Sequence, residues 1–283
     1  MPTTSFLVIF FFSLVSLFAL KMFLNTLPYN EDHYEIVIGN YWAVVVPQLV
    51  SVQEVNTVLP QDLELIEDRI QNGSYMVLYT FGYQNKVQPV FGGISLHYLE
   101  SIVAVPYVKF TPELEEKYGV NASFTFLPRL YLNDTWGIWL GRMYGMAKVK
   151  GHMVSDENAG SYKVSEYDSH DDIVQLSWKP STTWKASENF PYSRQYIEGS
   201  IVLPLVAETR LGVYLSCIFD WKFPQSSVRG VQGKMEFHKG FMEGLPSGSF
   251  SFTGLEKGPL GAYEINTNWT LSFPFLSLHT WYK

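Results

Sequence analysis

Two lysines at the end of an apolar, aromatic stretch are the residues of this chain best placed to do chemistry. Residues 130–152 read LYLNDTWGIWLGRMYGMAKVKGH and include Lys148 and Lys150. On a β-strand, residues two apart share a face, so both lysines would lie side by side with Val149 opposite. A neighbouring ammonium and apolar burial each lower the pKa of a lysine, and the uncharged amine is the form that attacks a carbonyl carbon. The alternative interpretation is two surface lysines whose aliphatic stems lie along a strand edge.

Sequence patterns for other common catalytic sites are missing. The chain has no G-x-S-x-G, H-E-x-x-H, P-loop or G-x-G-x-x-G motif, and its six histidines include no pair at i, i+4 spacing. The adjacent set Ser169-His170-Asp171 is interpreted as a solvated turn, because neighbouring strand residues point to opposite faces and a triad is a spatial arrangement. We therefore expect no metal site and no cofactor.

Composition limits the classes of partner and fold. The net charge is −7, so no basic stripe is available for nucleic acid. A single cysteine, Cys217, excludes an internal disulfide and is expected to be a small core residue. Apolar residues make up 47% of the chain and aromatic residues 16%, which is enough for a large core and for an aromatic pocket.

The N-terminus carries an apolar run at residues 6–20, followed by Lys21. Fifteen residues suit the core of a signal peptide, whereas counting on to residue 24 gives a length that could span a membrane, so both interpretations of residues 1–25 stay open. Lys21 after the run would favour a cytosolic domain if the segment is an anchor. Four N-x-[ST] sequons instead favour an extracellular or lumenal domain over residues 26–283 and predict glycosylation. Their asparagines are Asn72, Asn121, Asn133 and Asn268.

Most of the body of the chain shows strand patterns. We expect strands at 34–46, 75–83, 98–110, 173–178, 195–205, 211–221 and 233–237, with further apolar segments at 123–132 and 138–140. Residues 51–59 predict a short helix that Pro60 ends, 112–118 a brief helix or turn, and 263–276 a helix or strand. The polar residues 160–172 suggest a hairpin rim, and 244–261 frequent turns. Because there is no βαβ rhythm, these patterns favour a mainly β (β-rich α+β) fold, an antiparallel β-barrel with a few short helices.

The stretch around the lysines resembles the acetoacetate decarboxylase family. Residues 131–151 contain a Tyr-Leu segment, then Gly-Arg, an aromatic-glycine pair and a lysine beside a second lysine, similar to the family signature. Tyr98-Leu-Glu100 with Ala104-Val-Pro106 is similar to the family's Tyr-x-Glu element, and weaker similarities lie at Val58-Leu-Pro60 and Tyr263-Glu-Ile. The resemblance runs in family order from about residue 41 to residue 275. It implies the family's barrel fold, an oligomer, and a Schiff-base lysine at Lys148 with Glu100 in the active site.

Departures from the family pattern affect the expected chemistry. Matching Tyr144-Gly145 to the aromatic-glycine pair needs one deletion and makes Lys148 the nucleophile. The ungapped match instead places Val149 at the position of the nucleophile and Lys150 at the position of the second lysine. The family's adjacent lysines have become Lys-Val-Lys, and Ala147 stands in place of a proline. Tyr41 occupies the position of the family's substrate-carboxylate arginine, and a second active-site glutamate is replaced near residue 79.

The resemblance implies a Schiff-base lyase that acts on a small keto acid. Lys148 would form the iminium, Lys150 would help keep Lys148 uncharged, and Glu100 would orient the substrate or carry protons. Arg142 would bind substrate or anchor its loop; Tyr144, Tyr98 and Tyr41 complete the expected substrate-binding set. Alternative functions are a non-catalytic barrel that binds a hydrophobic small molecule, and a structural or interaction protein that reuses the fold. A membrane is expected to be contacted through the N-terminal segment alone.

Overall fold

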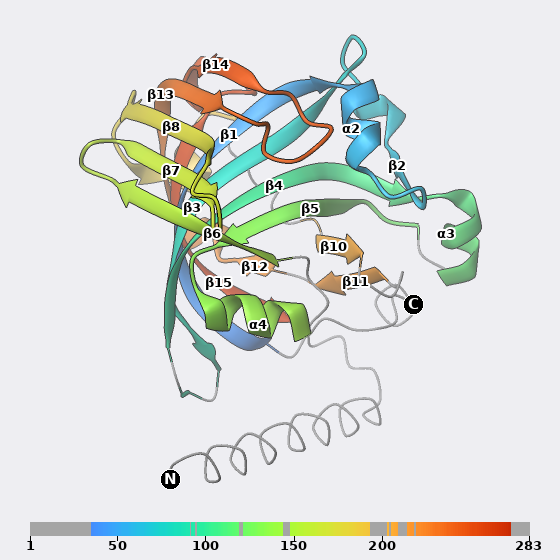
Figure 1. The fold of residues 1–283 in the computed structure, drawn as a ribbon, viewed down its shortest axis with the longest axis horizontal. Helices are drawn as coiled ribbons and strands as arrows, with labels where there is room; N and C mark the ends of the chain where they lie inside the picture. Colours follow the sequence, from blue (N-terminus) through green and yellow to red (C-terminus); the bar gives the residue numbers. More distant parts are fainter. Residues whose placement is uncertain are drawn as a thin grey trace. The chain divides into compact units, whose positions relative to one another are not determined.

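The computed structural model describes residues 35–90, 92–93, 95–118, 121–143, 148–192, 203, 205–208, 214–217 and 219–272 (Figure 1). Strands dominate this part of the chain: β1 Glu35–Ser51, β2 Leu63–Leu65, β3 Ser74–Pro89, β4 Leu96–Phe110, β5 Phe124–Leu132, β6 Lys148–Asp156, β7 Ser161–Glu166, β8 Asp172–Pro180, β9 Lys185–Ala186, β10 Leu205–Glu208, β11 Tyr214–Cys217, β12 Phe219–Trp221, β13 Ser227–Phe237, β14 Gly248–Phe252 and β15 Tyr263–Ser272. The helices are short: α2 Val52–Val58, α3 Pro112–Tyr118 and α4 Thr135–Met143, with 3-10 turns at Glu67–Arg69, Ser187–Asn189, Phe223–Gln225 and Leu255–Lys257. The mainly β class predicted from the sequence is confirmed.

The strand pairings form a closed circuit. The sheet runs β5-β6-β7-β8-β13-β15-β1-β3-β4, and β4 pairs with β5 again, so the described strands of this path have neighbours on both sides. Closing a sheet in this way removes exposed edges. The described strands thus form a ring of pairings.

One part of the topology differs from the predicted all-antiparallel arrangement. β5 pairs in parallel with β6 and with β10, whereas the other pairings of the described strands are antiparallel. Parallel neighbours need a crossover connection, and α4 supplies it between β5 and β6 (Figure 1). The expectation of no βαβ unit was therefore wrong at this point, because the helix spans only Thr135–Met143 and its pattern is too brief to stand out.

The predicted helix after β1 is confirmed, and its boundaries have clear causes. Ser51 caps α2: its Oγ accepts a hydrogen bond from the backbone N–H of Glu54 at 3.2 Å and donates to the Glu54 carboxylate at 2.6 Å. Val55 and Val58 are buried on the face that meets the sheet. The helix ends at Leu59, immediately before Pro60.

The polar segment 160–172, predicted as a hairpin rim, contains the first strand and the turn of the β7–β8 hairpin. It contains β7, which pairs with β6 and β8 and buries Tyr162 and Val164. The alternating side chains that face away from the core, such as Lys163, are polar and hid the strand in the sequence. The turn that follows includes Ser169, His170 and Asp171, all exposed, as predicted for a solvated turn.

The remaining expectations are met where the structure describes them. Residues 263–272 form a strand rather than a helix, and 112–118 form a helix. Residues 195–202, 211–213 and 273–276, together with the N-terminal segment 1–34 and the side chain of Cys217, lie outside the described residues. Among the residues that are described, no helix has both the length and the apolar character needed to cross a membrane.

Both faces of the central strands are buried, which explains their nearly continuous apolar sequence. On β1, Val44 and Val46 belong to one core cluster, whereas Tyr41, Ala43 and Val45 belong to a second cluster. The second cluster lies on the same sheet face as the residues considered below.

The turn between the 3-10 turn Glu67–Arg69 and β3 gives a test of the local structure. Asn72 and Gly73 have positive φ values of 50° and 75°, and Gln71 and Ser74 exchange backbone hydrogen bonds across them, as in a type I′ turn. Because an L-residue is strained at this φ, Gly73→Ala is expected to lower the free energy of unfolding by about 1 kcal/mol in urea denaturation. Gly258→Ala, in open space with extended φ, is the matched control and should be neutral or slightly stabilising. Equal effects of the two substitutions would contradict the assigned turn.

Candidate active site

The strand register brings the predicted catalytic residues to one face of the sheet. Glu100 on β4 pairs with Leu132 on β5, and Leu132 pairs with Lys150 on β6. Paired residues on neighbouring strands point to the same face, and Lys148 lies two residues before Lys150. Glu100 and both lysines therefore share this face, whereas Val149 packs in the opposite core cluster. The alternation predicted for residues 148–150 is confirmed.

Glu100 is a buried carboxyl group held by two neutral side chains. It is 5% exposed, and the amide nitrogen of Gln84 donates a hydrogen bond to its Oε1 at 2.9 Å. The indole N–H of Trp269 donates to the Gln84 Oε1 at 2.8 Å, which fixes the orientation of the amide. Burial raises the pKa of Glu100, while the Gln84 hydrogen bond, the charge of Lys148 and the hydroxyl of Tyr41 lower it in part. The net direction is upward, so this carboxyl keeps its proton to a higher pH than an exposed glutamate.

Three buried tyrosines lie near Glu100. Burial raises the pKa of Tyr41, Tyr98 and Tyr162, and the negative charge of Glu100 raises each of them further. The Tyr162 hydroxyl lies 3.1 and 3.0 Å from the carbonyl oxygens of Gly82 and Glu100, to which it donates. These groups are uncharged donors at neutral pH.

Helix α4 covers Lys148. The Lys148 Nζ lies 3.4 Å from the carbonyl oxygen of Gly137, to which it donates, and the aliphatic stem lies against Gly141. A Cβ at Gly141 would be 2.3 Å from the Cδ and Cε atoms of Lys148, so glycine is required for this path. Asp134 accepts a hydrogen bond from the backbone N–H of Gly137 at 2.6 Å and stabilises the start of the helix. Lys148 is half-buried between the helix and its strand.

Arg142 and Lys150 make contacts away from Glu100. Arg142 is exposed, and its Nε donates a hydrogen bond to the carbonyl oxygen of Lys148 at 3.0 Å, which fits the loop-anchoring alternative rather than substrate contact. The Lys150 ammonium lies over the ring of Tyr167, 4.0 Å from its centroid. Of the two lysines, Lys148 is the one whose charge lowers the pKa of Glu100. Tyr144 lies outside the described residues.

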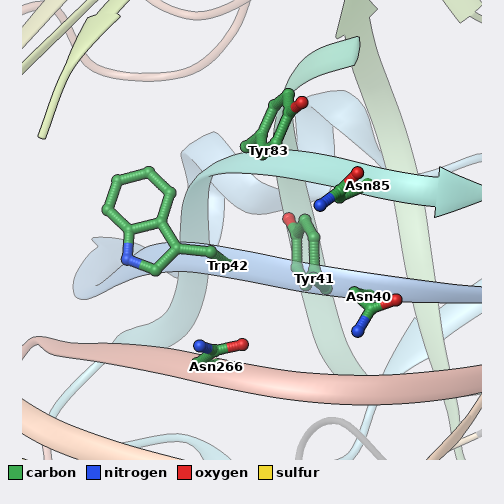
Figure 2. Close-up of a pocket in the computed structure, with 6 residues that line it drawn as sticks. All are labelled: Asn40, Tyr41, Trp42, Tyr83, Asn85 and Asn266. Carbon is green, nitrogen blue, oxygen red and sulfur yellow. The ribbon is translucent and has the colours of Figure 1, made fainter. Parts of the chain in front are cut away.

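A half-open hollow of about 240 Å³ lies beside this region (Figure 2). It shares Tyr41 with the site but contains neither Glu100 nor Lys148. The side chains adjacent to Tyr41 on β1 point to the other sheet face, so the polar part of the hollow lies across the strands from Glu100. Its lining residues are Asn40, Tyr41, Trp42, Tyr83, Asn85 and Asn266.

The predicted glycosylation positions are accessible. Each sequon asparagine is exposed, which glycosylation requires, and modification itself stays a prediction. The four are Asn72, Asn121, Asn133 and Asn268. Within the described part of the chain, no group of three or more His, Cys, Asp or Glu side chains is arranged to hold a metal ion.

Sequence reasoning missed the residues that support Glu100. Gln84 and Trp269 come from strands far apart in the sequence and carry no motif, so only the sheet register could reveal them. Gly141 could have been found, because it precedes Arg142 in the segment already singled out.

Comparisons with known proteins show the fold. No protein-family model matches the chain, and no curated protein matches its sequence. Among solved structures, the enduracididine biosynthesis enzyme MppR complexed with pyruvate has a TM-score of 0.58 and 13% identity, covering 89% of this chain and 92% of that chain. An acetoacetate decarboxylase from Legionella pneumophila has a TM-score of 0.53 and 14% identity, covering 87% of both chains. An acetoacetate decarboxylase-like enzyme from Sphingomonas wittichii RW1 has a TM-score of 0.52 and 9% identity, covering 89% and 98%. The chain has an acetoacetate decarboxylase-like fold.

Replacement of Gly141 tests the path of Lys148. In Gly141→Ala the new Cβ would overlap the lysine stem, so the side chain should move outward and react faster with acetic anhydride, by about threefold or more as a partly buried amine becomes exposed. Mass spectrometry of the peptide that contains Lys148 measures this rate. Gly137→Ala is the control, because its Cβ would meet Leu132 and Tyr98 at 3.2 and 3.5 Å rather than Lys148. Unchanged labelling in Gly141→Ala would show that the lysine follows another path.

The raised pKa of Glu100 predicts a pH-dependent cost in stability. Because the folded chain holds this proton more tightly than the unfolded chain, stability should fall as pH rises above the ordinary carboxyl value of 4.5 and level off above the raised pKa. Glu100→Gln removes the effect, so its free energy of unfolding relative to the parent chain should increase across this window, by at most about 1.4 kcal/mol per pH unit. Urea denaturation from pH 4 to pH 8 measures the difference. A difference that is independent of pH contradicts the prediction.

Proposed function

We propose that the chain is an enzyme that forms a Schiff base between Lys148 and a small carbonyl compound, with decarboxylation of a small keto acid as the first reaction to test. The observation that carries the proposal is the placement of Lys148 under α4, on the same sheet face as Glu100 and close enough for its charge to lower the pKa of that carboxyl. Perturbed carboxyl groups beside a lysine are typical of active sites.

Lys148 and Glu100 each have a role in the proposed decarboxylation. The uncharged amine of Lys148 attacks the carbonyl carbon, and the protonated carboxyl of Glu100 donates to the oxygen, which leaves as water. The resulting iminium accepts the electron pair of the breaking carbon–carbon bond as carbon dioxide departs, and an enamine forms. Protonation of the enamine carbon and hydrolysis of the iminium return the ketone and the free amine. A raised carboxyl pKa suits Glu100 as the proton donor.

The fold supports this proposal. Solved structures of the same fold include acetoacetate decarboxylase and an enzyme complexed with pyruvate. Activity on a keto acid comes to this chain as an inference from that likeness and from its own residues.

A second candidate is non-catalytic binding of a hydrophobic small molecule. The aromatic groups beside the site favour it: the ring centroids of Tyr41 and Trp221 are 5.3 Å apart, and those of Phe219 and Trp269 are 5.0 Å apart. Such rings provide an apolar lining. Retained binding of an apolar ligand by Lys148→Ala, with no covalent adduct in the parent chain, would favour this function.

The proposed compartment is the secretory pathway, with the chain either cleaved after its leader or anchored by it. The four exposed sequon asparagines fit this location. A homo-oligomer is proposed from the resemblance to the family.

Reductive trapping tests the proposed function. Borohydride with a panel of small keto acids and ketones should give a covalent adduct at Lys148, mapped by peptide mass spectrometry, because the iminium is reduced to a stable secondary amine. Lys148→Ala should lose the adduct, and Lys150→Ala should retain it. Failure of every panel member to label Lys148 or Lys150 would end the proposal, and labelling at Lys150 alone would move the nucleophile.

A further inference from the structure

A chain of two hydrogen bonds connects an indole to the Glu100 carboxyl group. The Nε1–H of Trp269 on β15 donates to the Oε1 of Gln84 on β3 at 2.8 Å, and the Gln84 Nε2 donates to the Glu100 Oε1 on β4 at 2.9 Å. The side chains of Trp269, Gln84 and Glu100 are 3%, 3% and 5% exposed. Because all three are shielded from bulk water, each hydrogen bond constrains the next.

A glycine on β1 lets the indole reach across that strand. β1 lies between β15 and β3 in the sheet, and Gly39 pairs with Trp269. A Cβ at Gly39 would lie 2.7 Å from the Cζ2 and 3.0 Å from the Nε1 of Trp269, so a larger residue would displace the indole. The ring centroid of Phe219 lies 5.0 Å from that of Trp269. The indole is therefore packed in place over β1 with its N–H on Gln84.

The indole determines which end of the Gln84 amide faces Glu100. An indole N–H can only donate, so the Gln84 atom that it contacts must be the carbonyl oxygen. The amide nitrogen is thereby turned to Glu100, where its hydrogen bond favours the carboxylate and lowers the pKa of Glu100 against the effect of burial. With the amide reversed, its oxygen would accept from the protonated carboxyl and hold the proton in place. The same amide can thus assist or oppose proton release.

We propose that Trp269 is a positioning residue for the acid group of the site: it holds the Gln84 amide in the orientation that donates to Glu100, so that Glu100 can release its proton to the carbonyl oxygen of the substrate. The inference rests on the proposed Schiff-base function and adds a control on its proton donor. Trp269 acts through Gln84 rather than on the substrate.

Other ionisable groups also act on Glu100, and the test must separate them from the amide. Within the part of the chain that the structure describes, they are Lys148 on β6, Tyr41 on β1, Tyr98 on β4 and Tyr162 on β7. An effect of Trp269 that passed through any of these groups would persist after removal of the Gln84 amide. An effect that passes through the amide would disappear with it.

A double-variant cycle makes this distinction. The Glu100 carboxyl stretch, assigned with Glu100→Gln, is titrated by infrared spectroscopy in the parent chain, Trp269→Phe, Gln84→Met and the double variant. Trp269→Phe should raise the pKa of Glu100 and increase its proton affinity about three- to tenfold, the effect of one neutral hydrogen bond. Gln84→Met should also raise the pKa of Glu100, and adding Trp269→Phe to it should change nothing further. Gly39→Ala, which displaces the indole, should act like Trp269→Phe and is the second variant if that chain fails to fold.

The pH profile of the reaction gives a readout that a purely structural role would not move. Cyanoborohydride trapping of acetoacetate at Lys148 should fall at high pH as Glu100 ionises, and in Trp269→Phe this fall should move to higher pH. A structural defect alone would lower the rate equally at every pH. Trp178→Phe is the control, because its indole donates to Glu264 at 2.6 Å in the other core cluster. It should leave the titration of Glu100 and the pH profile unchanged.

The outcomes separate this inference from the function on which it rests. An unchanged Glu100 titration in Trp269→Phe and Gly39→Ala overturns the inference, as does an effect of Trp269→Phe that is equally large in the Gln84→Met background. Either result leaves the proposed Schiff-base function standing. No adduct at Lys148 with acetoacetate or with the wider panel removes the proposed function, and the titration still decides the role of Trp269 at Glu100.

Discussion

Burial of the Glu100 carboxyl is the constraint on which the rest of this site depends. An ionised carboxylate at 5% exposure is strongly disfavoured, and the structure responds with neutral donors, a nearby lysine and a raised pKa. The chain from Trp269 through Gln84 holds the carboxyl group by hydrogen bonds of 2.8 and 2.9 Å. That arrangement shifts the pKa of Glu100 upward while a lysine lies near it, which is the combination that the proposed iminium chemistry uses.

The parallel crossover from β5 to β6 places the amine there. α4 fills the connection, and its glycines leave space on the face that meets the sheet, so the stem of Lys148 passes under the helix. Near the end of α4, the Nε of Arg142 donates a hydrogen bond to the carbonyl oxygen of Lys148. Sheet register and helix packing thus position a lysine and a glutamate that lie 48 residues apart in the sequence.

The sequence predicted the parts of this site that depend on local pattern. Strand alternation gave the shared face of Lys148 and Lys150, and the resemblance to the family identified Glu100 and the mainly β fold. The partnership of Gln84 with Trp269, 185 residues apart, could not be predicted because it arises from long-range pairing without a motif. β7 was missed for a different reason: its outward residues are polar, and its two buried apolar residues, Tyr162 and Val164, are too few to show a clear alternation. The contact between Lys150 and Tyr167 likewise depends on how a turn folds back over a strand.

The coupling between Glu100 and Lys148 can be measured directly by infrared titration of the Glu100 carboxyl stretch, assigned with Glu100→Gln, in the parent chain and in Lys148→Met. The account predicts that Glu100 titrates above an ordinary glutamate, and that its pKa rises further in Lys148→Met because the lysine charge stabilises the carboxylate. An ordinary titration in the parent chain, or one that Lys148→Met leaves unchanged, would contradict the claim that these two groups share one buried site.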